Sequence, residues 1–377
     1  MRIAHFGNMA NDAFPVVEAL TAKGFSVELY IYRPCHVTAL PHWELGTFPE
    51  STIGNLYDPN LEALDKLCPM PDWVHVLDLR GTPPFSKPQR ALRIIREMRK
   101  FDFIVAHVPF PIYAQFSSRP FAAFDAGAIR YLSLPGLRMR LMRRAYRKAK
   151  CIVVTNPDTI FRYRFPNDCL EKVPFLIDTN RYSPRASHNY HDALNADFLV
   201  YCPARQYWVE KGNDILIRGF RKFMDGNPHI SSRLFLAKWG NDLAKSEKLI
   251  QDLSLKNFVE WIPLSPKPKL IELYNAVDVV ADQFILGSYG TACPEAMACE
   301  KPVVMHLERT YMLHFFGELA PILEARTPDQ VAEKFSQCLD PAFRDRIGKE
   351  SREWVLEHHA AEIVAKRHLE ICERYAR

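Results

Sequence analysis

Two basic residues lie where they could bind a charged, phosphate-bearing substrate. Arg205 follows the apolar run FLVYCPA, and Lys211 comes six residues later, beside Gly212 at the start of a helical pattern. Arginine offers a planar fork of donors and lysine a point charge, and together they can grip a diphosphate. Solvated cations are the alternative, although a helix N-terminus mildly disfavours them. The pair therefore indicates a phosphate ligand.

The loop GSYGTACPEAMA adds a carboxylate, Glu295, between the apolar run VDVVADQ and a helical pattern. We expect Pro294 at the first helical position and Cys293 as the N-cap, which leaves the first N–H groups free for an anion. Gly290 would let a ligand approach the backbone. Glu295 could accept hydrogen bonds from paired sugar hydroxyls, or could simply favour the positive end of the helix dipole.

These residues need a scaffold that brings the ends of several strands together. Short apolar runs alternate with helical patterns from RIAHF to CIVVTN, and the alternation restarts from FLVYCPA to PVVMH. Such alternation is typical of parallel sheets covered by helices on both faces. The sequence predicts an α/β protein with two Rossmann-like domains that face a cleft at the carboxyl ends of their strands.

A polar stretch, NRYSPRASHNYHDALNAD, separates the two series of strands. Its composition is that of an interdomain linker. We place the N-terminal domain at residues 1–190 and the C-terminal domain at residues 191–359. Residues 34–71 fit neither pattern and are interpreted as an insertion.

The composition of the 377 residues excludes several classes of protein. No apolar run approaches the roughly 20 residues of a membrane-spanning helix, and the first residues lack the apolar core of a signal peptide. The nine cysteines form no CxxC pair, a pattern of reduced thiols. We therefore expect a cytoplasmic protein.

The stretch between Asp125 and Asp158 contains no acidic residue, whereas residues 137–150 are rich in arginine and lysine. We expect a helix with Leu137, Leu141, Met142 and Ala145 near one face. A solvated face is the simplest interpretation. Docking on the anionic inner face of a membrane as a peripheral protein is the alternative. Nucleic acid is not expected as a partner, because no aromatic ladder accompanies the charge.

Taken together, these motifs resemble the GT-B glycosyltransferases of the large retaining family 4. The resemblance rests on PARQYWVEKGNDILIRGF and GSYGTACPEAMACEKPVV, which match the family's Lys-Gly pair and its Glu-x7-Glu loop. Four further segments are similar to family motifs: VPFLIDTNRYSP, LFLAKWGND, VEWIPL and FDFIVAHVPF. The likeness is strongest from about Cys151 to His306.

The resemblance implies a role for each candidate site residue. Arg205 and Lys211 would bind the diphosphate of a nucleotide-sugar donor and take part in catalysis, and Glu295 would hold the ribose hydroxyls. His107 would lie beside the reacting sugar, unless it is a structural, hydrogen-bonded histidine. The remaining candidates are backbone donors to phosphate and sugar (Gly290, Thr291 and Ala292) and contacts to acceptor or sugar (Asn11 and Asp125).

Two positions depart from the family pattern. Gly287 stands where the family has the first glutamate of the pair, which commonly contacts the donor sugar. Asp125 lies where relatives often carry His-Gly or His-Asp, and it could equally cap a helix. Gly287 motivates one alternative function, a catalytically inactive nucleotide-sugar-binding subunit, and the shared architecture motivates another, a UDP-sugar 2-epimerase.

The function implied by the resemblance is that of a hexosyltransferase-type enzyme of class EC 2.4. It would move a sugar from a nucleotide-diphosphate-sugar to a hydroxyl of a glycan or lipid-linked acceptor in polysaccharide biosynthesis, with retention of configuration. No cofactor is expected, since the nucleotide-sugar is a substrate. No metal is expected either, because Asp278 and Asp282 do not form a DxD motif. The terminal helix, residues 360–377, would cross back to the N-terminal domain.

Overall fold

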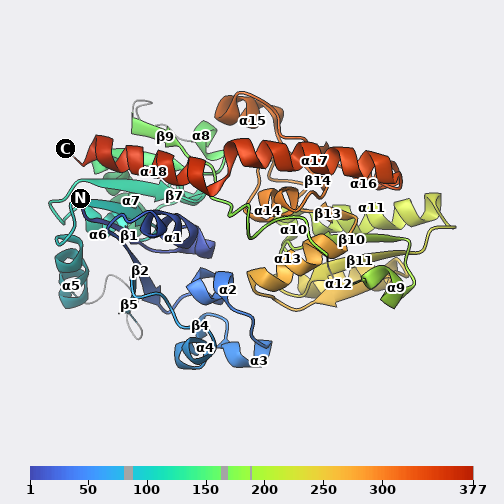
Figure 1. Ribbon diagram of the computed structural model, residues 1–377, viewed down its shortest axis with the longest axis horizontal. Helices are drawn as coiled ribbons and strands as arrows, with labels where there is room; N and C mark the ends of the chain where they lie inside the picture. Colours follow the sequence, from blue (N-terminus) through green and yellow to red (C-terminus); the bar gives the residue numbers. More distant parts are fainter. Residues whose placement is uncertain (80–87, 163–168, 187–188, 377) are drawn as a thin grey trace. The chain divides into compact units, whose positions relative to one another are not determined.

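The computed structural model describes residues 1–79, 88–162, 169–186 and 189–376 (Figure 1). The chain forms two compact units: unit 1 comprises Met1–Leu176 with His359–Arg377, and unit 2 comprises Ile177–His358. Each unit is built on a sheet of parallel strands, which confirms the predicted α/β fold with two Rossmann-like halves.

Unit 1 is built on a seven-stranded sheet in the order β5-β2-β1-β6-β7-β8-β9. Its central strands are buried along their whole length because helices cover both faces. The strands are β1 (Ile3–Phe6), β2 (Val27–Arg33), β5 (Val74–Asp78), β6 (Phe103–His107), β7 (Phe121–Asp125), β8 (Cys151–Val154) and β9 (Leu170–Lys172).

The C-terminal helix belongs to unit 1, as expected for residues 360–377. This helix, α18 (Ala361–Tyr375), lies against α1 and β7 (Figure 1). The other helices of the unit outside the insertion are η1 (Met9–Asn11), α1 (Phe14–Ala22), α5 (Pro88–Met98), α6 (Pro111–Ala114), η3 (Ala128–Tyr131), α7 (Leu137–Lys148) and α8 (Thr159–Arg162).

The segment interpreted as an insertion connects β2 to β5 through short elements only. They are η2 (Val37–Ala39), α2 (Pro41–Leu45), α3 (Glu50–Ile53), β3 (Gly54–Asn55), β4 (Asp58–Pro59) and α4 (Leu61–Leu67). The β3–β4 pair is antiparallel and separate from the main sheet. The segment therefore adds to unit 1 without extending its sheet.

Unit 2 has a six-stranded parallel sheet in the order β12-β11-β10-β13-β14-β15. The strands are β10 (Phe198–Cys202), β11 (Ser232–Ala237), β12 (Val259–Ile262), β13 (Val279–Ala281), β14 (Val303–Met305) and β15 (Leu323–Glu324). The helices are α9 (Tyr190–Leu194), α10 (Trp208–Lys211), α11 (Asn213–Gly226), α12 (Leu243–Asp252), α13 (Lys267–Ala276), α14 (Ala292–Ala298), α15 (Arg309–Phe316), α16 (Pro328–Gln337) and α17 (Pro341–His358).

The chain passes from unit 1 to unit 2 between Leu176 and Ile177, ahead of the whole polar stretch. The reason lies in contacts of the next residues with unit 2. The Arg352 guanidinium donates to the carbonyl oxygens of Thr179 and Tyr182, at 3.3 and 3.2 Å. The Arg185 N–H donates to Asn275 Oδ1 at 2.9 Å.

Two further features of the fold concern the cysteines and the helices. All nine cysteines are free thiols, and most of them are buried in the two cores. Within the described ranges, the helices are too short or too polar to cross a bilayer.

Candidate active site

The candidate residues of unit 2 follow two neighbouring strands, β10 and β13. These strands pair in parallel, so the segments that follow them leave the same edge of the sheet. The sheet order reverses between them, because β10 continues to β11 on one side and β13 to β14 on the other. Such a switch point opens a crevice in which ligands of doubly wound proteins bind.

Lys211 ties the two segments together. It ends the short helix α10, and its Nζ donates to Gln283 Oε1 at 2.9 Å. Its carbonyl oxygen accepts the Phe284 N–H at 2.8 Å. Gln283 is buried and donates in turn to the Ser288 carbonyl oxygen. The lysine is therefore fixed against the loop after β13.

Gly212, the residue after Lys211, meets a steric requirement. Its φ is +66°, and an added Cβ would lie 3.1 Å from Phe284 Cβ. A side chain here would push the loop after β13 away from α10, so the Lys-Gly pair of the sequence is a packing requirement as well as a motif.

Arg205 lies in the loop between β10 and α10, with its side chain 44% exposed. Its Nη2 is 3.3 Å from Glu210 Oε2, and its guanidinium lies 5.2 Å from the centre of the Tyr207 ring. The neighbours steer the side chain but leave much of its donor fork accessible to a ligand.

The backbone of the loop after β13 requires glycine at position 287. Gly287 has φ of +70°, and an added Cβ would lie 3.0 Å from His306 Nε2 and 3.2 Å from Glu308 Cβ. The Glu308 N–H also donates to the Gly287 carbonyl oxygen at 3.0 Å. The absent family side chain would therefore begin beside Glu308, a residue that sequence reasoning missed.

Helix α14 begins earlier than predicted. Thr291 is its N-cap and Ala292 its first residue, so the assignment of Cys293 as the N-cap was wrong. Proline is tolerated throughout the first turn, where N–H groups lack helical partners, so Pro294 did not mark the first position. Within the described part of the chain, the N–H groups of Gly290 and Thr291 donate to no other group.

Glu295 is buried, with 3% of its side chain exposed, and engages two partners. One carboxylate oxygen pairs with Lys267 Nζ, and the other accepts the Tyr274 hydroxyl at 3.2 Å. Burial, followed by the charge of Glu295, raises the pKa of Tyr274. Lys267 was also missed: it is the first residue of helix α13, which carries other polar side chains as well, so its burial had no clear sequence signal.

Asp278 and Asp282 have separate surroundings. Asp278 lies 3.3 Å from both Arg344 Nη2 and His191 Nε2. Asp282 is buried, and burial raises the pKa of its carboxyl group although the charge of Lys211 opposes the shift.

His107, the candidate from unit 1, lies in a buried cluster at the end of β6. It is 1% exposed, and its ring stacks on Phe124 at 4.2 Å between centroids. Its Nε2 is 3.2 Å from His5 Nδ1, and its Nδ1 is 3.3 Å from Asp12 Oδ1. Both ring nitrogens thus face protein groups.

Asn11 is also buried, at 3% exposure, with φ of +65°. Its Oδ1 accepts from Asn8 Nδ2 at 2.6 Å, and its Nδ2 donates to Glu44 Oε2 at 3.3 Å. These contacts join the loop after β1 to helix α2 of the insertion.

Asp125 is completely buried at the end of β7. Its carboxylate accepts the N–H groups of Gly127 and Ile129, at 3.2 and 2.8 Å, and the Tyr146 hydroxyl at 3.2 Å. Burial raises its pKa to about 6, although these hydrogen bonds act in the opposite direction. The contacts favour the capping alternative, since they hold the turn that enters η3.

The match to a known protein family lies within unit 2. Residues 194–354 match the model of the family described as glycosyl transferases group 1. D-inositol 3-phosphate glycosyltransferase of Corynebacterium jeikeium is 28% identical over 158 residues, which cover 39% of this chain and 38% of the relative. The enzyme of the same name from Kribbella flavida is 24% identical over 187 residues, covering 46% and 43%. The chain thus spans less than half the length of these curated relatives.

Solved structures match over the whole chain. HepE of Anabaena in complex with UDP and glucose has a TM-score of 0.74 at 14% identity and covers 99% of this chain and 100% of its own. Sucrose-phosphate synthase of Thermosynechococcus elongatus has a TM-score of 0.69 at 16% identity, with coverages of 99% and 98%. The chain has the GT-B fold and resembles the glycosyl transferases of group 1.

The segment that matches group 1 contains only part of the candidate site. Arg205, Lys211 and the loop from Gly287 to Glu295 lie inside residues 194–354. His107, Asn11 and Asp125 lie outside it, in unit 1, and the side chains of all three are buried among protein groups. The likeness to group 1 therefore includes the candidate residues at the β10–β13 edge and none of the candidates in unit 1.

Proposed function

We propose that this chain is a glycosyltransferase that moves a sugar from a nucleotide-diphosphate-sugar to an acceptor hydroxyl. One observation carries the proposal: Lys211 and the loop after β13 are joined at the switch point of unit 2, with Arg205 exposed in the adjoining loop. The group 1 match over the same residues supports it. UDP is the first nucleotide to test, because HepE was solved with UDP and glucose.

Arg205 and Lys211 would bind the diphosphate and stabilise its charge as it leaves. The bond between the anomeric carbon and the diphosphate oxygen breaks, and the acceptor oxygen forms the new bond on the same face, with retention. The acceptor proton passes to the departing diphosphate. Fixed donors aimed at developing charge are a major source of catalysis, and the Lys211–Gln283 contact fixes one in advance.

Glu295 and the preceding loop would hold the rest of the nucleotide and the sugar. A carboxylate oxygen has two lone pairs, so Glu295 can accept ribose hydroxyls in addition to its contacts with Lys267 and Tyr274. The free N–H groups of Gly290 and Thr291 would donate to phosphate or sugar oxygens, together with the backbone of Ala292.

Glu308 would supply the carboxylate that the family pattern places at position 287. Its Cβ lies 3.2 Å from the point where a Cβ of residue 287 would stand, and its side chain is partly exposed. A carboxylate can thus reach the same region from a different backbone position. This assignment makes Gly287 compatible with activity and gives the donor sugar a partner.

The candidates of unit 1 would act in positioning. The Gly7 backbone approaches His107 so closely that an added Cβ would lie 2.9 Å from His107 Cβ. His107 would therefore shape the loop that carries Asn11, and Asp125 would hold the turn before η3. The acceptor would be a glycan or a lipid-linked sugar bound by unit 1 in a pathway of polysaccharide biosynthesis.

The proposed chemistry uses no metal and no cofactor. The cations Arg205 and Lys211 would meet the charge that a divalent ion meets in other transferases. In the described part of the chain, one group of side chains could share a metal ion: Glu318, Glu357 and His358. That group includes none of the donor-site candidates.

Helix α7 would dock on an anionic membrane that holds a lipid-linked acceptor. Arg138, Arg140, Arg144 and Arg147 are exposed on it. Apolar side chains are exposed beside these cations, since Tyr131, Leu134 and Leu137 are 50, 53 and 69% exposed. Leu137 therefore lies outside the buried face, which consists of Met142, Ala145 and Tyr146. Cations next to apolar groups are typical of surface-binding helices.

A donor screen tests the proposed function. The protein is mixed with UDP-, GDP- and ADP-sugars, melting is followed for each, and products are identified by mass spectrometry. A bound donor raises the melting temperature by mass action. Slow release of nucleoside diphosphate and free sugar supports transfer, whereas an epimerised donor identifies a 2-epimerase. Stabilisation with no turnover of any donor, with and without glycan acceptors, identifies a binding subunit.

A further inference from the structure

Unit 1 contains a pocket of about 420 Å³ away from the strand ends that carry His107 and Asp125. Its walls include Phe121, the first residue of β7, and Lys150, which directly precedes β8. It therefore lies at the amino ends of these strands, on the edge of the sheet opposite to their carboxyl ends. Its volume is within the range of small-molecule sites, roughly 300–1,000 Å³.

The charge of the pocket is positive. Its described lining carries Arg119, Lys148 and Lys150 and no carboxylate. Lys148 and Lys150 are exposed, and neither forms an ion pair with another described residue. Lys148 in the last turn of α7 would by itself be explained by the helix dipole. Lys150 and Arg119 come from other segments, so the convergence needs a different explanation.

Gln115 gives the pocket a specific hydrogen-bonding feature. The residue is 9% exposed, and its Nε2 donates to the carbonyl oxygens of Ile112 and Leu141, at 3.1 and 3.3 Å. These two acceptors fix the amide orientation and leave Oε1 without a partner among the described residues. A buried acceptor without a donor is costly, so a ligand donor would be favoured here.

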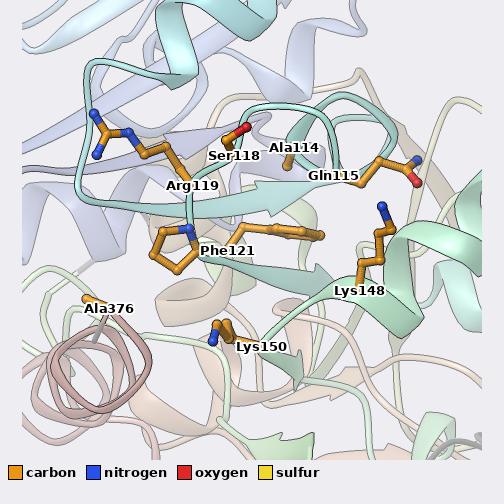
Figure 2. Close-up of a pocket in the computed structure, with 9 residues that line it drawn as sticks. Ala114, Gln115, Ser118, Arg119, Phe121, Lys148, Lys150 and Ala376 are labelled. Carbon is orange, nitrogen blue, oxygen red and sulfur yellow. The ribbon is translucent and has the colours of Figure 1, made fainter.

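The arrangement of the side chains suits one ligand with two kinds of group. Figure 2 shows the ammonium end of Lys148 directed toward the Gln115 amide, with the Phe121 ring in the middle of the view. An anion beside the lysines would balance their charge, and a hydroxyl beside Gln115 would donate to its unpaired oxygen. The ring would pack against a carbon skeleton between them.

We propose that this pocket binds a phosphate ester that carries a free hydroxyl group. The phosphate lies between Lys148 and Lys150, and the hydroxyl donates to Gln115 Oε1. The ligand comes either from solution or from the headgroup of an anionic lipid such as phosphatidylglycerol. The site is separate from the donor site of unit 2 and does not depend on the proposed function.

Calorimetric titration of the full chain tests the proposal, with glycerol 3-phosphate and inorganic phosphate as probes and excess UDP present to fill the donor site. We expect saturable binding of glycerol 3-phosphate in the presence of UDP. Lys148→Ala/Lys150→Ala should weaken it at least about tenfold, since two charged hydrogen bonds are lost. Lys23→Ala removes an exposed cation of unit 1 outside the pocket and should leave the affinity unchanged.

Gln115→Met separates the two halves of the proposal. The variant should weaken glycerol 3-phosphate to the affinity of inorganic phosphate while leaving inorganic phosphate unaffected. The same variant leaves the charge of α7 unchanged, so it should bind phosphatidylglycerol vesicles more weakly than the wild type if the lipid headgroup is the ligand, and equally well if the ligand comes from solution. Absence of saturable glycerol 3-phosphate binding, or equal loss of affinity in Lys23→Ala, overturns the site.

Discussion

Lys267 and Glu295 form an ion pair inside unit 2, with side-chain exposures of 10% and 3%. The Tyr274 hydroxyl completes the contacts of the carboxylate. A pair withdrawn from water in this way is stable only as a pair, because each partner alone would be a buried charge. The carboxylate proposed to bind ribose thus depends on a lysine from another helix.

Lys267→Met should lower the free energy of unfolding by roughly 3 kcal/mol, the lower end of the range for breaking a buried pair from one side. Chemical denaturation measures the change. Lys267→Met/Glu295→Gln should recover much of the loss, because no unpaired charge remains. If the free energy of unfolding of the single variant lies within about 0.5 kcal/mol of the wild-type value, as for neutral surface changes, the pair does not stabilise the fold.

Lys211→Ala should reduce turnover by a factor on the order of 10²–10³, the loss seen when one donor to developing charge is removed. Arg205→Ala should act in the same direction. Product formation from the donor found in the screen is the measurement. Lys222→Ala is the control, since Lys222 is an exposed cation on α11 paired with Asp329. Near-normal turnover of both Lys211→Ala and Arg205→Ala would refute the diphosphate assignment.

Gly287→Ala and Glu308→Gln should have different effects. The alanine variant should lose about 1–2 kcal/mol of stability, because φ of +70° is a left-handed conformation and its Cβ would approach His306. Gly287→Glu would meet the same strain. Glu308→Gln should keep the wild-type stability but raise the KM for the donor. Unchanged donor kinetics in Glu308→Gln would show that Glu308 does not bind the donor sugar.

Asp125 should give a pH dependence of stability with a defined sign. Its folded pKa of about 6 lies above the ordinary 3.8, so the folded state binds more protons between these values. The contribution of Asp125 to stability is therefore complete below about pH 4 and is lost as the pH rises through 6. The loss is about 3 kcal/mol for a shift of about two units.

Asp125→Asn isolates this contribution. The amide does not ionise and keeps one acceptor oxygen, for the Ile129 N–H. The Gly127 N–H loses its acceptor, a cost that is the same at every pH. We expect the difference in unfolding free energy between variant and wild type to move in favour of the variant by about 3 kcal/mol from pH 4 to pH 7. A difference that is independent of pH would show that the carboxyl group titrates normally.

Binding of α7 to membranes should depend on lipid charge and on salt. The wild type should sediment with vesicles containing an anionic lipid and not with neutral ones. Each cation that lies near the anionic surface should contribute about 1 kcal/mol to the binding free energy. Raising the salt to about 1 M shortens the Debye length to about 3 Å and should release the protein. Arg140→Glu/Arg147→Glu should abolish binding.

The choice of these two arginines for the membrane test follows from the structure. Arg143 donates to the carbonyl oxygens of Leu132 and Leu134, and replacing it would disturb the fold. Lys349→Glu/Lys366→Glu makes the same charge change on other helices and should bind like the wild type. Equal behaviour of both double variants on both lipids would leave α7 as a solvated face.

The sequence predicted the scaffold because the signal is local. Apolar runs such as FIVAH and FLVYC are continuous, and each became a buried strand. The Lys267–Glu295 pair was not predictable, because its members are 28 residues apart and buried lysines are rare. The start of α14 was misplaced because Pro294 fits several positions of a first turn. Glu308 was missed because its relation to Gly287 exists only in three dimensions.

Helix α18 gives unit 1 two separate stretches of chain, with all of unit 2 between them. A ribosome therefore produces the sheet of unit 1 first and the helix that covers it last. Until Val364, His368 and Ile371 emerge, the surfaces of α1 and β7 that they contact remain open to water. Unit 2, whose residues are contiguous, can finish folding before the unit that precedes it. A released chain that ends at His358 should accordingly resist protease in unit 2 while unit 1 is still cleaved.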